Sequence, residues 1–169
     1  MKNVAVLVED MYQDLEVWYP YLRFKEEGFC VYAVGTGRAK AYKSKHGYEI
    51  PQDLSVEKAS RLDFAAIVIP GGFAPDMLRR YPAVNNFVRD NFKKGSIIGS
   101  ICHGGWVLVS AGILDGRTVT SFFAIKDDMV NAGAKFVDKE VVVDGNLITS
   151  RKPEDLPAFM KAILKALEK

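Results

Sequence analysis

The residue of this chain best suited to chemistry is Cys102, which ends a short apolar run and precedes His103 and two glycines. A strand that turns sharply into a helix at a reactive side chain forms a nucleophile elbow, and small neighbours let a substrate approach it. The start of a helix favours a thiolate, the reactive form of cysteine. We therefore predict that Cys102 is an activated nucleophile. Cys30 lies inside an apolar run and is interpreted as an inert structural residue.

His103 is the nearest candidate for a general base. Its side chain need not reach the sulfur, because consecutive side chains leave a backbone in different directions. The other histidine, His46, lies in a polar segment and is interpreted as a loop residue. No histidine follows residue 150. That absence argues against a class I glutamine amidotransferase, whose His-Glu pair comes late in the chain.

Glu16 is the acid whose position is most informative. It stands four residues before Pro20, and a proline within a helix removes the hydrogen bond to that earlier carbonyl. A carboxyl at such a distorted helix start could turn inward and exchange a hydrogen bond with the Cys102 sulfur. The alternative is that Glu16 only caps the helix.

Two glycines and an acid follow another apolar run. Gly71 and Gly72 come directly after Pro70, and their backbone N–H groups could converge on an oxyanion. The alternative is a plain turn at the end of a strand. Asp76 lies just beyond them, where it could serve only as an acid at the start of a helix.

The elements that must position these residues alternate along the chain. Strands are expected from buried apolar runs at residues 4–8, 29–34, 64–69, 96–101, 141–143 and 147–149. Helices are expected where apolar residues recur at helical spacing. The first contains Leu15, Trp18, Tyr19 and Leu22, with Asp14 as its cap and Gly28 at its end. The others contain Val84, Phe87, Val88 and Phe92; residues 106–111; Ile125, Met129 and Val130; and Phe159, Ile163 and Leu167. Residues 38–54 are predicted to form a small hairpin or loop. This alternation predicts an α/β fold with a mainly parallel sheet, whose ligands bind beyond the carboxyl ends of the strands.

Composition limits the class of protein. The chain has 169 residues and a formal net charge of +2, which predicts a single domain over residues 1–169 without the basic excess of a nucleic-acid-binding protein. Two Cys and two His make neither a disulfide framework nor an ordinary four-ligand zinc site, so we expect no metal and a cytoplasmic location. No dinucleotide or phosphate-loop motif is present, and no cofactor is expected. No apolar run approaches the length of a membrane span.

With these residues in place, the chain resembles the ThiJ/PfpI superfamily, and most closely the PfpI-type intracellular cysteine peptidases and protein deglycases. The resemblance covers essentially the whole chain. It rests on Glu16 four before Pro20 and on the segments 45–48 (KHGY), 70–72 (PGG), 100–104 (SICHG), 125–129 (IKDDM) and 143–146 (VDGN).

The resemblance implies a flavodoxin-like three-layer sandwich, related to the fold of class I glutamine amidotransferases, with Cys102 as nucleophile and Glu16 in contact with it. It implies oxyanion donors at Gly72 and His103. It also implies homodimers or homohexamers in which Asp76 reaches the His103 of a neighbouring copy. The chain departs from the family pattern at Gln13, at Asp76, which is shorter than the family's Glu, at Gly105-Trp106 and at Phe122-Phe123.

Three functions follow from these residues. The first is a cysteine-dependent hydrolase acting on peptides or on glycated and aldehyde-modified protein groups. The second is a redox or stress sensor whose Cys102 is oxidised to a sulfinic acid held by Glu16. The third is a glyoxalase-like lyase acting on 2-oxoaldehydes.

Overall fold

A seven-stranded sheet forms the centre of the chain, in a computed structural model that describes residues 2–168. Its strand order is β10-β11-β7-β6-β1-β2-β5. Every neighbouring pair is parallel except β10 with β11. The strands are β1 (Asn3–Val8), β2 (Cys30–Gly35), β5 (Leu54–Ser55), β6 (Ala66–Ile69), β7 (Ile97–Ile101), β10 (Val141–Asp144) and β11 (Leu147–Ser150).

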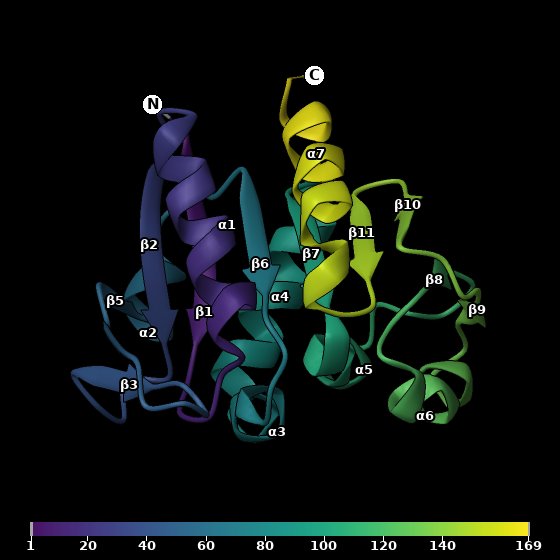
Figure 1. The fold of residues 1–169 in the computed structure, drawn as a ribbon, viewed down its shortest axis with the longest axis horizontal. Helices are drawn as coiled ribbons and strands as arrows, with labels where there is room; N and C mark the ends of the chain where they lie inside the picture. The colour runs from purple at the N-terminus through teal and green to yellow at the C-terminus, as the bar shows by residue number, and fades with distance from the viewer. Residues whose placement is uncertain (1, 169) are drawn as a thin grey trace.

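Helices cover both faces of this sheet, so the predicted three-layer, flavodoxin-like α/β fold is confirmed (Figure 1). On one face, α1 (Asp14–Glu26) packs on β1 and β2, and α7 (Leu156–Leu167) packs on β7 and β11. The helices that pack with one another on the other side are α2 (Val56–Ala59), α3 (Ala74–Arg79), α4 (Pro82–Lys94) and α5 (Gly105–Ala111). The short α6 (Lys126–Asn131) lies against α5. Strands covered in this way are buried on both faces, which explains their continuous apolar runs.

The helix α1 forms where it was predicted, but the predicted apolar face was wrong. Leu15 and Leu22 are each 56% exposed, and Tyr19 is also exposed. The buried face is the next one around the helix, formed by Glu16, Val17, Pro20 and Phe24. The cap was also wrong, since the Gln13 side chain and not Asp14 accepts the Glu16 N–H at 3.1 Å. Turning this face inward is what carries Glu16 into the interior.

Residues 38–54 form the predicted hairpin and one strand that was not predicted. The strands β3 (Ala41–Lys43) and β4 (Glu49–Pro51) pair antiparallel, and β5 then joins the edge of the main sheet. Two further short strands, β8 (Thr118–Val119) and β9 (Lys135–Phe136), pair with each other outside that sheet. Val130, predicted to belong to the apolar face of α6, is 45% exposed.

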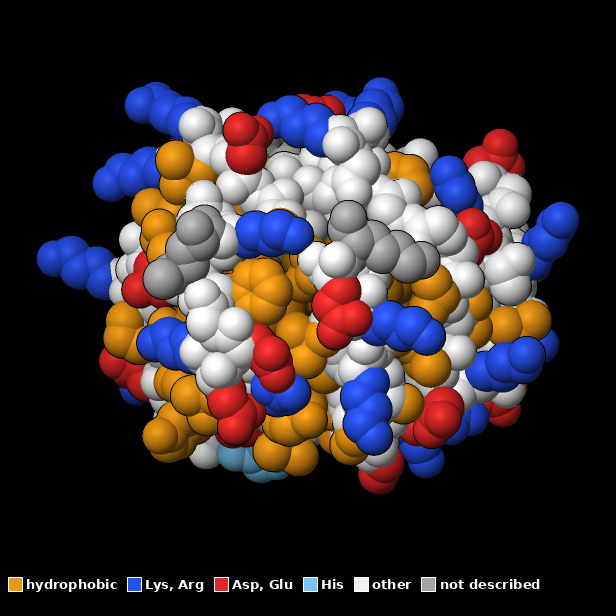
Figure 2. All heavy atoms as spheres, turned by 90° about the horizontal axis from the view of Figure 1, so that it is seen from above, with side chains coloured by type: hydrophobic (Ala, Val, Ile, Leu, Met, Phe, Trp, Pro, Cys, Tyr) orange, Lys and Arg blue, Asp and Glu red, His pale blue; other side chains and the backbone are white. Residues whose placement is uncertain are grey.

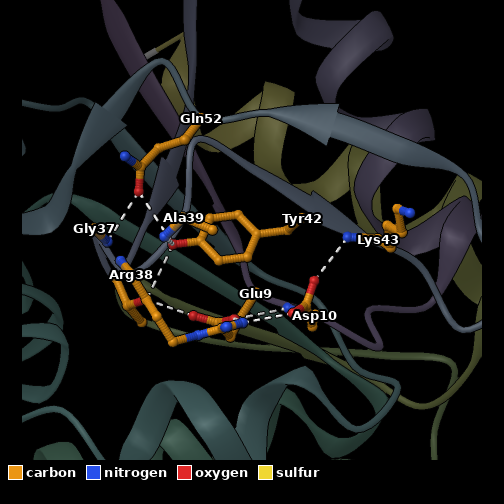
Figure 3. A network of polar contacts seen from close by, with 9 residues as sticks. Glu9, Asp10, Gly37, Arg38, Ala39, Tyr42, Lys43 and Gln52 are labelled. Carbon is orange, nitrogen blue, oxygen red and sulfur yellow. Dashed lines mark hydrogen bonds and ion pairs between the residues drawn. The ribbon is translucent and has the colours of Figure 1, made fainter.

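A buried carboxylate fastens the hairpin region to the end of β1. Glu9 is fully buried, accepts hydrogen bonds from Arg38 at 2.7 Å and from the Thr36 hydroxyl, and is surrounded by the network of Figure 3. Arg38 also binds Asp10 at 2.5 Å, and Asp10 accepts the Lys43 N–H at 2.9 Å. The network therefore fixes the segment that follows β1 to the hairpin.

The parallel strands run from the end of the sheet near both termini to the opposite end, where the loops after β1, β6 and β7 meet (Figure 1). Figure 2 views the molecule from the side of the termini. There, Lys and Arg side chains alternate with Asp and Glu and do not form one basic patch on the face in view. Within residues 2–168, no helix has the length and apolar character needed to cross a bilayer. The candidate site, formed by the loops after β1, β6 and β7, lies at the end of the sheet remote from the termini.

Candidate active site

Cys102 forms the predicted elbow. The strand β7 ends at Ile101, a 3₁₀ turn covers Cys102–Gly104, and α5 begins at Gly105. The Cys102 backbone has φ of +60°, a left-handed conformation that costs a non-glycine residue roughly 1–2 kcal/mol. The surrounding structure must hold the residue in that conformation, which fixes the direction of the sulfur.

The glycines after the elbow have a different purpose from the predicted one. A Cβ on Gly104 would lie 2.5 Å from the Ile69 carbonyl oxygen, and one on Gly105 would lie 2.7 Å from the Met129 sulfur. Both are below any contact that a real Cβ makes. The glycines are therefore needed for the close packing of this segment on β6 and α6, a requirement that does not depend on a substrate.

His103 does reach the sulfur, although it is the adjacent residue. Its Nδ1 lies 3.3 Å from the Cys102 Sγ. Its ring is stacked on Phe122, with centroids 5.0 Å apart, and meets Trp106 edge-on at the same distance. Burial, followed by the charge of Lys45, lowers the pKa of His103 below its ordinary value of 6.5. The imidazole is therefore neutral at pH 7 and able to accept a proton.

Glu16 is not a helix cap, because its side chain is fully buried beside the thiol. One carboxyl oxygen, Oε2, accepts the Gly71 N–H at 2.6 Å. The other, Oε1, is buried without a hydrogen-bond partner among the described residues. Burial raises the pKa of Glu16 to about 7, so the carboxyl holds a proton in a large part of the population at neutral pH.

The predicted low pKa of the Cys102 thiol was wrong in direction. Burial and the neighbouring Glu16 carboxylate raise its pKa to about 12. The N–H groups of His103 and Gly72 interact with the sulfur and lower the pKa, but by less. Reasoning from a helix start accounted for favourable N–H groups and missed desolvation and the like charge. The resting site therefore holds a thiol with a neutral imidazole beside it.

The two glycines after Pro70 divide their roles. The N–H of Gly71 is used by Glu16, so it is not available for an oxyanion as predicted. A Cβ at Gly71 would lie 2.6 Å from Glu16 Oε2 and 2.7 Å from the Cys102 Cβ. Gly72 has φ of +77° and is closely approached by the backbone after β1. Its N–H and that of His103 both hydrogen-bond the sulfur, so two backbone donors lie side by side at the thiol.

A cavity of about 420 Å³ opens in front of the thiol. Several residues that line it were given no site role from the sequence: Met11, Lys45, Phe73, Lys152 and Pro153. These come from loops, whose direction no apolar periodicity reveals. Gln13, Trp106 and Phe122, singled out only as departures from the family pattern, also line the cavity.

The remaining predicted residues lie apart from the thiol. Asp76 is paired with Arg80, the residue that directly follows α3, and does not line the cavity. His46 is exposed and binds Asp14 at 2.7 Å, as suits a loop histidine. Cys30 is only half-buried, near the Tyr32 hydroxyl at 3.3 Å. Of the predicted site residues, the fold thus brings together Cys102, His103, Glu16, Gly71 and Gly72.

Known proteins share this sequence and fold. The model of the DJ-1/PfpI family matches residues 2–166. A deglycase of Pyrococcus horikoshii is 45% identical over 166 residues, 98% of this chain and 99% of the relative. The deglycase PfpI of Pyrococcus furiosus is 41% identical over the same shares of the two chains. A two-domain protein of Anabaena variabilis, with DJ-1/ThiJ/PfpI-like and ferritin-like domains, superposes with a TM-score of 0.96 at 42% identity, covering 99% of this chain and 48% of that one. The chain therefore belongs to the DJ-1/PfpI family.

Proposed function

We propose that this chain is a cysteine-dependent hydrolase of the PfpI type that acts on aldehyde-modified or peptide groups of proteins. The observation that carries the proposal is the strained elbow at Cys102, with the His103 Nδ1 only 3.3 Å from the sulfur. Nucleophile and base within reach of each other are the signature of covalent catalysis. Two relatives at 41–45% identity are named deglycases, which supports a modified group as substrate.

In the proposed reaction on a peptide bond, His103 takes the thiol proton while the Cys102 sulfur forms a bond to the carbonyl carbon that bears the leaving nitrogen. The carbonyl electrons move to oxygen, where the N–H groups of Gly72 and His103 hold the negative charge. The leaving nitrogen departs with the proton carried by His103. Water then cleaves the carbon–sulfur bond and restores the thiol, so that the net reaction is hydrolysis. In a 2-oxoaldehyde adduct the nitrogen is on a carbinol carbon, so the sulfur first displaces the amine there. Transfer of that carbon's proton to the adjacent carbonyl carbon, with the carbinol oxygen becoming the carbonyl, then gives a thioester, which water hydrolyses in the same way. Here Glu16 holds the Gly71–Gly72 turn in place.

A neighbouring copy of the chain is proposed to complete the base. Within residues 2–168, the Nε2 of His103 has no hydrogen-bond partner, so only the contact of Nδ1 with the sulfur orients the ring from that side. A carboxylate in that position would orient the ring and stabilise the imidazolium. Asp76 of another copy is the proposed source, after release from Arg80.

The deciding experiment compares three substrates on the purified protein: free methylglyoxal, a methylglyoxal-modified peptide and casein. We expect release of the unmodified peptide, lost in Cys102→Ala and kept in the matched Cys30→Ala variant. Turnover of methylglyoxal alone would instead support the lyase. No turnover of any of the three, together with oxidation of Cys102 by peroxide, would support the sensor.

A further inference from the structure

A second cavity adjoins the one in front of Cys102. Its volume is about 410 Å³, and it shares two lining residues, Phe122 and Lys152, with the first. Phe122 is tied to the elbow, since its N–H donates to the Cys102 carbonyl at 3.3 Å and its ring stacks on His103. A substrate whose reactive carbon faces the thiol can therefore extend past Phe122 into a second space.

The walls of this second cavity are aromatic. Phe123 is 76% exposed and lies against Phe122, with ring centroids 4.7 Å apart. Phe136 forms another part of the lining. An aromatic ring as exposed as that of Phe123 gains little from the fold itself, whereas a bound apolar group would cover it.

The rim of the second cavity is cationic. Lys126 and Lys152 line it, and neither has a carboxylate within 4.0 Å in the part of the chain described. The third cation, Arg151, is occupied, because it binds Asp155 at 2.8 Å and Asp138 at 2.7 Å. Asp138 is the acid of the lining, and its charge is directed to Arg151. Lys45, in the first cavity, adds a further positive charge.

From this juxtaposition we infer that the second cavity is a substrate subsite for a residue that has an apolar side chain and an anionic group. Lys126 and Lys152 would bind the anionic group. Phe122, Phe123 and Phe136 would surround the apolar side chain. The inference rests on the proposed function, because it assumes that the substrate reacts at Cys102. It deepens that function by naming a substrate class: adducts of residues that bear a free carboxylate, as at a peptide C-terminus, or a phosphate.

The test uses reagents that alkylate Cys102 without needing turnover. Nα-bromoacetyl-phenylalanine and its C-terminal amide differ only in the carboxylate, and each forms a carbon–sulfur bond with loss of bromide. Their rate ratio cancels the reactivity of the thiol itself. We expect the acid to react roughly threefold to fivefold faster than the amide, which is the size of an exposed ion pair. The preference should shrink as salt is added.

Matched variants locate the effect. Lys126→Met and Lys152→Met should each reduce the ratio towards one, whereas Lys58→Met, at the other edge of the sheet, should leave it unchanged. Phe123→Ser should slow both reagents but not bromoacetyl-glycine, which lacks the ring. A bromoacetyl derivative of phosphoethanolamine distinguishes phosphate from carboxylate as the preferred anion. A ratio of one in the wild type, or equal ratios in all the lysine variants, would overturn the subsite. Because alkylation needs no hydrolysis, that result is separate from failure of the deglycase assay.

Discussion

At the scale of single residues, the decisive pair is Glu16 and Cys102. Both are buried side by side, so the negative charge of the Glu16 carboxylate raises the pKa of the Cys102 thiol. The sequence pointed to both, through the spacing of Glu16 to Pro20 and through the elbow. It could not give their proton affinities, because these depend on burial and on the few ångströms between two segments 86 positions apart in the chain. Desolvation and like charge outweigh the N–H groups at the thiol.

The stability of the protein should depend on pH through Glu16. Its pKa rises from 4.5 to about 7 on folding, so the folded state holds a proton that the unfolded state has lost between these values. The free energy of unfolding of the wild type should therefore fall, relative to Glu16→Gln, by about 3 kcal/mol as the pH rises from 4.5 to 7, and the difference should stay constant above pH 7. Urea denaturation of both proteins at several pH values measures this. A difference that did not vary with pH would contradict the raised pKa.

The same substitution should make the thiol more reactive. Removing the Glu16 charge lowers the pKa of Cys102 towards its ordinary value, so Glu16→Gln should be alkylated faster than the wild type at pH 8–9. The rate of alkylation by iodoacetamide is measured against pH, with mass mapping to separate Cys102 from Cys30, the internal reference. The inflection of each curve gives the apparent pKa of the thiol. A lower inflection in the wild type would mean that a protonated Glu16 stabilises the thiolate.

At the scale of elements, α1 shows how a correct helix can be given the wrong face. Its most regular apolar spacing is Leu15, Tyr19 and Leu22, and these residues face solvent. The face that is buried contains a carboxyl and a proline, which periodicity scores as polar or disruptive. The helix of the site was misread because its function, carrying Glu16 to the thiol, conflicts with ordinary amphipathic patterning.

The hairpin region offers a second prediction at this scale. Arg38→Met should destabilise the fold by about 1–2 kcal/mol, because it leaves Glu9 fully buried without its guanidinium partner. The half-exposed position of Arg38 keeps the loss below that of a buried pair. Arg89→Met, which removes a surface arginine paired with its neighbour Asp90, is the matched control. Equal midpoints of chemical denaturation for the two variants would show that the Glu9 network is not stabilising.

At the scale of the whole molecule, alternating strands and helices predicted the parallel sheet and placed the site at the carboxyl ends of the strands. The elements that were missed, β5, α2, α3, β8 and β9, have two to six residues each. Such segments are too short to show a period, and tertiary contacts decide them. The partner of His103 stays a prediction, because the resemblance implies Asp76 of a neighbouring copy, and Asp76 is paired with Arg80 in this chain.

Assembly can be tested by mixing inactive proteins. Subunits carrying Cys102→Ala are combined with subunits carrying Asp76→Ala, and peptide release is measured in a confirmed mixed oligomer. If Asp76 acts across an interface, some sites combine an intact Cys102 with a neighbour's intact Asp76, and activity partly returns. General-base assistance is worth roughly 10²–10⁴-fold, so recovery is measurable. Activity no higher than the average of the two parents would remove Asp76 from the mechanism.

The order of the strands also sets when the site comes into being. The cavity in front of Cys102 takes its lining from Met11 at one end of the chain to Lys152 and Pro153 at the other. During synthesis from the N-terminus, the elbow sequence is made well before β11, which pairs beside β7 and leads to Lys152. Until that strand is added, Cys102 has neither its finished pocket nor its cationic rim. A nascent chain therefore carries Cys102 without part of its pocket, and the complete site exists only after the last strand has docked.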